Sequence, residues 1–223
     1  MTICTICTLK RAQEISGKLT IKNKKMPGSA FPTSTEKCGV GSALKLVPGS
    51  VCAECYAARA ENFRPNVAQG YMKNWVKTET MVNENMDLWC EGIVYQIYHF
   101  FKKTNVPFHR WFDSGDLYSV EWLIAIARVA RLTPDVMHWL PTKEKAIVLE
   151  FKKNHRVPKN LIIRVSSAMI DSEPLKGFKT TSTVHKNKDP HGQQCIAEFQ
   201  DGHCGDCRAC WNPKIKNISY HKH

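Results

Sequence analysis

The sequence has no long apolar run and no sign of a secretory leader. Its longest apolar stretch, WLIAIARVARL at 122–132, is interrupted by arginines and is too short to span a membrane. The opening residues, MTICTICTLKRAQEI, lack the basic, apolar and small-residue order of a signal peptide. We therefore expect no membrane segment and a cytoplasmic protein. In such a reducing compartment, thiols more often bind metals than form disulfides.

Common catalytic motifs are missing as well. The chain contains no H-E-x-x-H, P-loop, G-x-S-x-G or dinucleotide-binding motif, which excludes the commoner hydrolases and nucleotide-binding enzymes. Acidic residues are few, with 20 against 32 lysines and arginines and a formal net charge of +12. Because the basic residues are spread along the chain, we expect either a nucleic acid or other anionic partner, or a basic protein without one.

What the sequence does contain is cysteine, ten in 223 residues, and seven of these fall into two groups. The first thiol group is Cys38, Cys52 and Cys55. The second thiol group is Cys195, Cys204, Cys207 and Cys210. Two successive C-x2-C turns in CGDCRACW offer three sulfur atoms from one short loop, the arrangement that ferredoxin-type segments use for a cubane, and Cys195 is the nearest candidate for the fourth corner.

The leading interpretation of these thiols is a [4Fe-4S] cluster, and the alternative is zinc, because soft all-thiolate sites bind both. A zinc site built from Cys52, Cys55, Cys207 and Cys210 would tie the two ends of the chain together. With either metal, we expect the loop-rich flanks to depend on it for their order.

The chain is expected to form one domain of four segments. Residues 1–37 are polar and predict an extended N-terminal segment, and 38–66 form a turn-rich cysteine loop. Residues 67–175 form an α/β core, beginning with a helix over about 67–103. From 176 to 223, Gly, Pro, His and Cys dominate and predict a cysteine-rich C-terminal cap held by metal.

The core alternates strands and helices. Strands are expected at 108–117, 136–142 and 160–171, with helices at 119–134 and 143–158 between them. This alternation is typical of parallel strands with helical crossovers, so the fold class is α/β, either a partial β/α barrel or an open parallel sheet.

Each predicted strand ends in polar residues. They are Asp113, Ser114, Gly115 and Asp116 in the first strand, Thr142 and Lys143 at the end of the second, and Ser166, Ser167 and Asp171 in the third. Because parallel strands end at one edge of a sheet, these residues are candidates for a common pocket. The alternative is that Asp, Ser and Thr only start the helices that follow.

Six segments in order resemble an uncharacterised family of phage-encoded cysteine-rich proteins. They are PGSVCAECYA, RPNV, RWFDSGD, HWLPTKE, RVSSAMID and CGDCRACW, and the resemblance covers about residues 26–220. It implies a phage protein working in the cytoplasm of the host cell, and it carries no activity with it.

A fainter resemblance is to radical S-adenosylmethionine (SAM) enzymes, in which a C-x3-C-x2-C loop holds a [4Fe-4S] cluster with one iron open to SAM. It implies that the first thiol group holds this cluster and that Gly115 and Asp116, in SGDL, belong to a SAM-binding motif. The second thiol group would then resemble an auxiliary-cluster region. The chain departs from that family because thirteen residues separate Cys38 from Cys52, and SGDL has Asp in place of Glu and no Pro.

Three functions are therefore compared. The first is an iron–sulfur protein with radical-type chemistry in the strand-end pocket. The second is a metalloprotein whose cluster is structural or redox-sensing and whose basic surface contacts nucleic acid or a host protein. The third is a zinc-stapled nucleic-acid-binding module.

Overall fold

A seven-stranded parallel sheet forms the centre of the protein. The computed structural model describes residues 6–21 and 25–222. The strands are β1 (Ser29–Phe31), β2 (Phe108–Trp111), β3 (Met137–Thr142), β4 (Leu161–Ile170), β5 (Thr181–His185), β6 (Gln193–Gln194) and β7 (Asn217–His221). They lie in the order β1-β2-β3-β4-β5-β7-β6, and every neighbouring pair is parallel. The predicted α/β class is confirmed, with an open sheet instead of a partial barrel.

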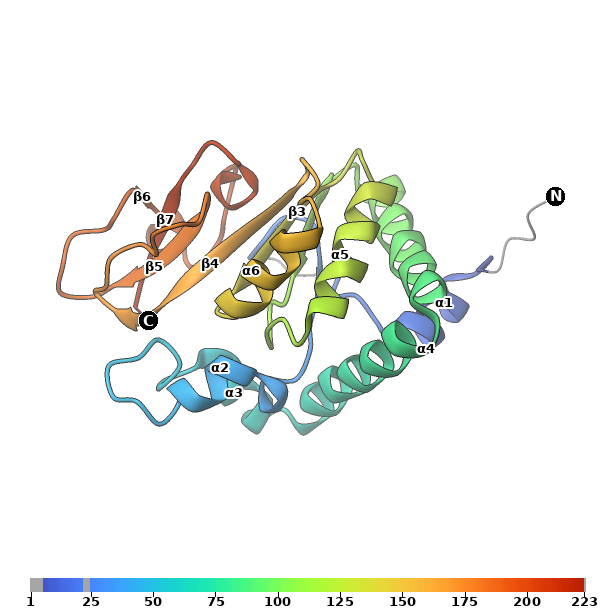
Figure 1. Cartoon of the computed structure of the whole chain (residues 1–223), viewed down its shortest axis with the longest axis horizontal. Coiled ribbons are helices and arrows are strands. Elements are labelled where there is room, and N and C mark those ends of the chain that lie inside the picture. The colour runs from blue at the N-terminus through green and yellow to red at the C-terminus, as the bar shows by residue number, and fades with distance from the viewer. Residues whose placement is uncertain (1–5, 22–24, 223) are drawn as a thin grey trace.

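Helices cover one face of this sheet, as Figure 1 shows. They are α4 (Pro65–Thr104), α5 (Val120–Leu132) and α6 (Lys145–Asn154), and α1 (Leu9–Ser16) packs against α4. The main core joins aromatic and aliphatic side chains of α4, α5 and α6 to those strand residues that point toward the helices, such as Trp111, Leu140 and Val165. Alternate residues of each strand therefore face the helices, and the residues between them face the opposite side.

The long helix α4 is interrupted at Asn85. There φ is −155° and ψ is 74°, which are not helical angles. The Asn85 side chain accepts a hydrogen bond from the Leu88 backbone amide at 3.0 Å, so it caps the second half of the helix at its start. The expected helix over 67–103 is thus present, with a break that its hydrophobic pattern does not reveal.

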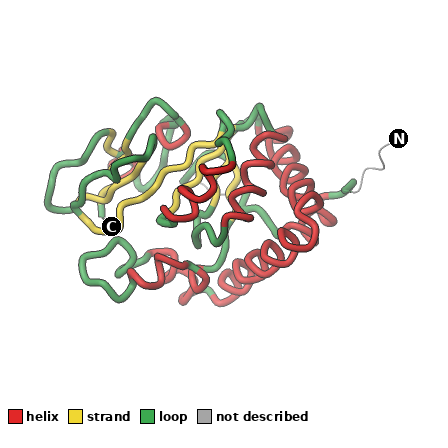
Figure 2. The backbone as a smooth tube through the Cα atoms, viewed as in Figure 1, coloured by secondary structure: helices red, strands yellow, loops and turns green. Residues whose placement is uncertain are grey.

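The C-terminal segment covers the opposite face of the sheet. A second apolar cluster joins Ala30, Trp139 and Met26 to Trp211, which lies in the short 3-10 helix Ala209–Trp211. The Trp211 indole donates to the backbone carbonyl of His109 in β2 at 2.9 Å. Most of the chain after β5 is loop (Figure 2), and it is held against the sheet by such contacts.

The two flanking segments contain more regular structure than expected. The N-terminal segment includes α1 and β1, and the cysteine loop includes α2 (Gly39–Leu44) and α3 (Tyr56–Phe63). The C-terminal cap contributes β5, β6 and β7, so the sheet has seven strands where three were predicted. β1 has only three residues, and strands that short give no periodic signal. Residues 1–5 of the predicted N-terminal segment lie outside the described part of the chain.

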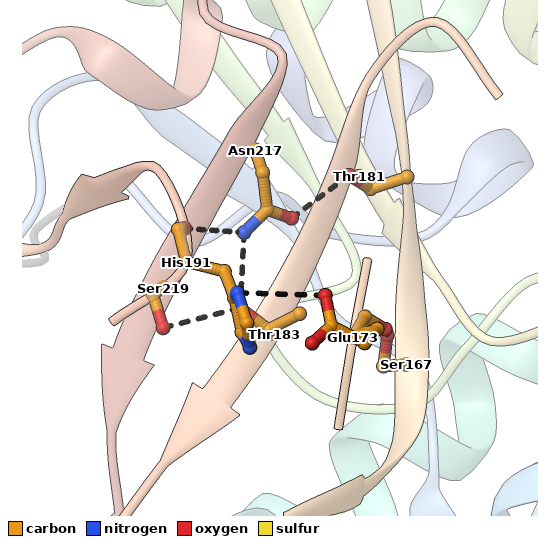
Figure 3. Close-up of polar contacts among 7 residues, drawn as sticks. All are labelled: Ser167, Glu173, Thr181, Thr183, His191, Asn217 and Ser219. Carbon is orange, nitrogen blue, oxygen red and sulfur yellow. Dashed lines mark hydrogen bonds and ion pairs between the residues drawn. The ribbon is translucent and has the colours of Figure 1, made fainter. Parts of the chain in front are cut away.

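A buried polar network joins β5 to β7 (Figure 3) and explains why these strands do not look like core strands. The Asn217 side chain accepts from Thr181 Oγ1 at 2.8 Å and donates to Thr183 Oγ1 at 3.0 Å. Thr183 in turn donates to Ser219 Oγ at 3.1 Å. Hydrogen bonding satisfies these side chains inside the protein, so a strand with few apolar residues can be buried.

Of the helices in the described residues, none is long and apolar enough to cross a membrane.

His138, on the helix side of β3, is a fully buried neutral imidazole. The Thr133 hydroxyl donates to the Val129 carbonyl at 2.8 Å, so the 2.8 Å contact between Thr133 Oγ1 and His138 Nε2 requires a proton on Nε2. His138 Nδ1 is buried without a partner. Burial lowers the pKa of His138 from 6.5 to about 3, because a second proton would have no acceptor.

The buried, neutral imidazole of His138 predicts that the protein loses stability in acid. Stability from a neutral buried His is complete above pH 6.5 and is lost as the pH falls toward 3. Between pH 7 and 4.5, His138 should contribute about 2 to 3 kcal/mol to the fall in unfolding free energy. In urea titrations, His138→Met should lose less stability over this interval than the parent, with His99→Met as the matched control. Equal losses in the parent and His138→Met would contradict this account.

Candidate metal centre

The first thiol group lies at the edge where the parallel strands end. Cys38 follows β1 and is the residue before α2, while Cys52 and Cys55 lie in the loop between α2 and α3. Figure 1 shows α2 and α3 beside the edge at which β4 ends. The register of the sheet therefore brings this loop to the same edge as the residues that follow β2 and β3.

Backbone hydrogen bonds attach the cysteine loop to β4. The Val51 amide donates to the Ala168 carbonyl at 2.9 Å, and the Ile170 amide donates to the Gly49 carbonyl at 3.0 Å. A carboxylate holds the other side of the loop, because Glu144, which follows β3, accepts from the Val40 amide at 2.7 Å. Cys52 thus lies between two fixed points on neighbouring strand ends.

Glu61 in α3 connects two of the loops at this edge, the one after β1 and the one after β2. It accepts from the Thr35 amide at 3.1 Å, from the Ser34 hydroxyl at 3.2 Å and from the Ser114 hydroxyl at 2.6 Å. Its side chain is buried, so these donors replace the water that it would otherwise bind. Sequence reasoning missed Glu61, because nothing in RAENF distinguishes it from a surface helix residue.

Gly41 in α2 leaves room beside two of the sulfur atoms. A Cβ atom at this position would lie 3.7 Å from both Cys38 Sγ and Cys52 Sγ, and 3.1 Å from Cys38 Cβ. Burial raises the pKa of Cys38 to about 12, with Asp116 and the neighbouring thiols acting in the same direction. Burial also raises the pKa of Cys52, while nearby Lys143 opposes it. Metal binding at this site must therefore displace protons from these thiols.

Two charged side chains at the end of β2 have atoms without a partner. One carboxylate oxygen of Asp113, Oδ1, is buried and accepts no hydrogen bond, and Nε of Arg110 is buried without an acceptor. Burial raises the pKa of Asp113, although the nearby Arg110 acts in the opposite direction. Such orphaned groups are uncommon inside proteins, and a bound ligand is one explanation for them.

Asp116 is placed differently, because the protein itself occupies both of its oxygen atoms. Oδ2 accepts from the Lys143 amide at 3.0 Å, and Oδ1 accepts from the Leu117 amide at 2.7 Å. Burial raises its pKa, and these hydrogen bonds lower it. Gly115 packs against the segment after β1, since a Cβ atom there would lie 2.1 Å from Thr33 Oγ1. Both residues hold the loop together, and Asp113 is the one with a free acceptor.

The other predicted pocket residues have structural partners. Thr142 accepts from the Glu144 amide at 3.0 Å, and Ser166 pairs with Ser182 at 2.8 Å across β4 and β5. Asp171 accepts from the amides of residues 186–188, the shortest contact being 2.6 Å to Lys186. Its φ of 58° places it in a turn after β4. Asp171 therefore holds the loop after β5.

The second thiol group lines one small enclosed cavity on the face opposite the helices. Its members line this cavity together with Ile196, Ile218 and neighbouring residues. Cys204 is anchored by its amide to the Lys25 carbonyl at 2.8 Å, and Cys210 Sγ lies 3.3 Å from the Tyr220 hydroxyl. Burial raises the pKa of Cys210 to about 12. Cys195 thus joins the thiols of CGDCRACW, as its spacing suggested.

The two thiol groups are separate. Arg164 in β4 contacts the Cys210 carbonyl, whereas the loop of the first group bonds to Ala168 on the same strand. These attachment points are roughly 13 Å apart along a strand. The thiols that influence each other electrostatically also belong to one group or to the other. The structure therefore does not combine Cys52 and Cys55 with Cys207 and Cys210.

In neither thiol group do the side chains converge on a single point. Among the described residues, no three His, Cys, Asp or Glu side chains converge in a way that could hold one metal ion. A zinc ion would require four sulfur atoms at about 2.3 Å from one centre. A cubane needs a wider arrangement, because each thiolate binds a different iron atom.

Comparison with known proteins gives a family. The family model described as Gene product 88 matches residues 9–213, which is most of the chain, and this agrees with the expected phage-type family. No curated protein and no solved structure matches the chain. These comparisons show no similarity to radical SAM enzymes.

The space beside Gly41 predicts opposite effects for two glycine substitutions. Gly41→Ala should destabilise the protein by about 1 to 3 kcal/mol, because its methyl group would press on Cys38. Gly70→Ala is the matched control in α4, where nothing lies within 4 Å, and it should stabilise by about 0.5 to 1 kcal/mol. Urea unfolding of both variants measures the difference, and a stabilising Gly41→Ala would show that the thiols do not need this space.

Proposed function

The chain belongs to the Gene product 88 family, and we propose that it is an iron–sulfur enzyme of the radical SAM type. In this proposal the first thiol group holds a [4Fe-4S] cluster with one iron free of protein ligands. The substrate pocket lies beside it, at the carboxyl ends of the strands. The observation that carries the proposal is the position of three thiols beside the loop that follows β2, in which Asp113 has an unpartnered oxygen. Asp116 of this loop is an electrostatic neighbour of Cys38, and the hydroxyl of Tyr56, the residue after Cys55, donates to the Asp113 carbonyl at 3.3 Å.

The residues present fit a cluster of this kind. Three thiols come from one loop, and Gly41 leaves room beside two of them. The thiols among the electrostatic neighbours of Cys38 and Cys52 all belong to the first group, and its three thiols would bind three corners of a cubane. The chemistry that such a cluster supplies when bound is the donation of one electron to a sulfonium such as SAM.

The orphaned oxygen of Asp113 suits the amino-acid part of SAM. That part is a zwitterion, with an ammonium group and a carboxylate on one carbon atom. The free oxygen of Asp113 can accept a hydrogen bond from the ammonium group. We therefore assign the SAM-binding role that was expected of Asp116 to Asp113, three residues earlier in the same loop.

The remaining residues of the edge keep these groups in place. Glu61 fixes the segments after β1 and β2, and Glu144 fixes the start of α2. Both carboxylates are buried and act through backbone amides and hydroxyls, so they set positions without contacting the ligand. Pre-organisation of this kind reduces the cost of ordering a site when it binds.

The proposal is tested with anaerobically purified protein that is reduced and mixed with SAM. The chain should release 5′-deoxyadenosine, and Cys52→Ser should abolish the release by removing a cluster ligand. Asp113→Asn should bind SAM about 10- to 100-fold more weakly, because a hydrogen bond to a charged group contributes about 1.5 to 3 kcal/mol. Binding is followed by equilibrium dialysis of the unreduced protein.

Asp135→Asn is the matched control, because this carboxylate is exposed at the opposite edge of the sheet, just before β3. It should leave SAM affinity unchanged. Absence of 5′-deoxyadenosine from a protein with an intact cluster would refute radical chemistry. Equal SAM affinity of Asp113→Asn and the parent would refute the role of Asp113.

A further inference from the structure

We propose that the second thiol group binds a second iron–sulfur cluster, in which all four irons have thiolate ligands and which lies among three arginine side chains. This inference does not depend on radical SAM chemistry at the first group. It rests on the placement of Arg164, Arg110 and Arg208 around the four thiols. A cluster with four thiolates has no open iron, so this site would store or transfer an electron and would not bind substrate.

Arg164 is the strongest sign of negative charge at this place. Its side chain is fully buried, and its donors go to backbone carbonyls only. The contacts include Cys210 O at 3.0 Å, Ala209 O at 3.0 Å and Asn212 O at 2.9 Å. Within the described residues, Arg164 forms no ion pair with a carboxylate. A guanidinium buried among neutral groups costs several kcal/mol, unless an anion lies nearby.

Two further arginines surround the same thiols. Arg110 lies over the Trp139 ring at 4.6 Å, and Arg208 lies over the Phe108 ring at 5.3 Å. Both are electrostatic neighbours of Cys204, and Arg110 is also a neighbour of Cys210. Aromatic rings restrict where these guanidinium groups can go, so the positive charge is fixed around the cavity. An anionic thiolate cluster supplies the missing counter-charge.

The arrangement of the thiols favours a cluster over a single ion. Three of them come from one C-x2-C-x2-C loop and the fourth precedes the 3-10 helix Ile196–Phe199, so the sulfur atoms line the cavity wall from different sides. Three sulfur atoms from one such loop and a fourth from a distant cysteine are the pattern of ferredoxin-type cubane sites. The Tyr220 hydroxyl, 3.3 Å from Cys210 Sγ, offers a hydrogen bond to a ligand sulfur, as is common around iron–sulfur clusters.

The first experiment separates the two sites. In the triple variant Cys38→Ala, Cys52→Ala, Cys55→Ala, the anaerobically purified protein should keep about four iron and four sulfide per chain. The matched variant Cys204→Ala, Cys207→Ala should lose the iron and sulfide of the second site. It should keep SAM cleavage by the first site only if the proposed function is also correct. A triple variant that contains no iron, or that contains zinc in place of iron, would overturn the proposal of a second cluster, whatever the outcome with SAM.

The second experiment tests the arginines. In the background of the triple variant, Arg164→Met should shift the midpoint potential of the remaining cluster to more negative values, because the reduced cluster carries more negative charge. If this variant does not fold, Arg208→Gln provides the same test at a less buried position. Arg131→Gln, on the helix side of the sheet, is the control. A potential that is the same in all of these proteins would contradict the proposed charge pairing.

Discussion

The parallel alignment of the strands is the constraint on which the rest of the structure depends. Because every neighbouring pair of strands runs in the same direction, the segments after β1, β2, β3 and β4 meet at one edge of the sheet. The cysteine loop is bound at this edge by backbone contacts to β4 and by the buried carboxylates Glu61 and Glu144. Its three thiols are therefore positioned by the sheet, although most of the loop has no apolar core of its own.

The strand-end edge and the helix-free face of the sheet give the two thiol groups different surroundings. The first group has carboxylates nearby, among them Asp116, and a ligand-free acceptor on Asp113. The second group is surrounded by guanidinium groups and a tyrosine hydroxyl. A site near free polar atoms is suited to bind a small molecule, and a site enclosed by cations is suited to hold negative charge. This division connects the fold to two separate chemical roles.

The α/β core could be predicted from the sequence because its apolar residues recur with clear periods in long segments, as in α5 and β4. β5 and β7 could not, because Thr181, Thr183 and Asn217 are buried through hydrogen bonds. The grouping of Cys195 with CGDCRACW follows from proximity in the chain, whereas the separation of the two thiol groups depends on long-range contacts. Glu61 and the unpartnered oxygen of Asp113 have no signature in the sequence, since both depend on tertiary packing.

Anomalous diffraction at the iron edge, from crystals grown without oxygen, tests the central claim most directly. The account predicts two separate iron peaks, one bounded by Cys38, Cys52 and Cys55 and the other by the four thiols of the second group. A single peak shared by thiols of both groups would contradict it, and so would crystals that contain no iron.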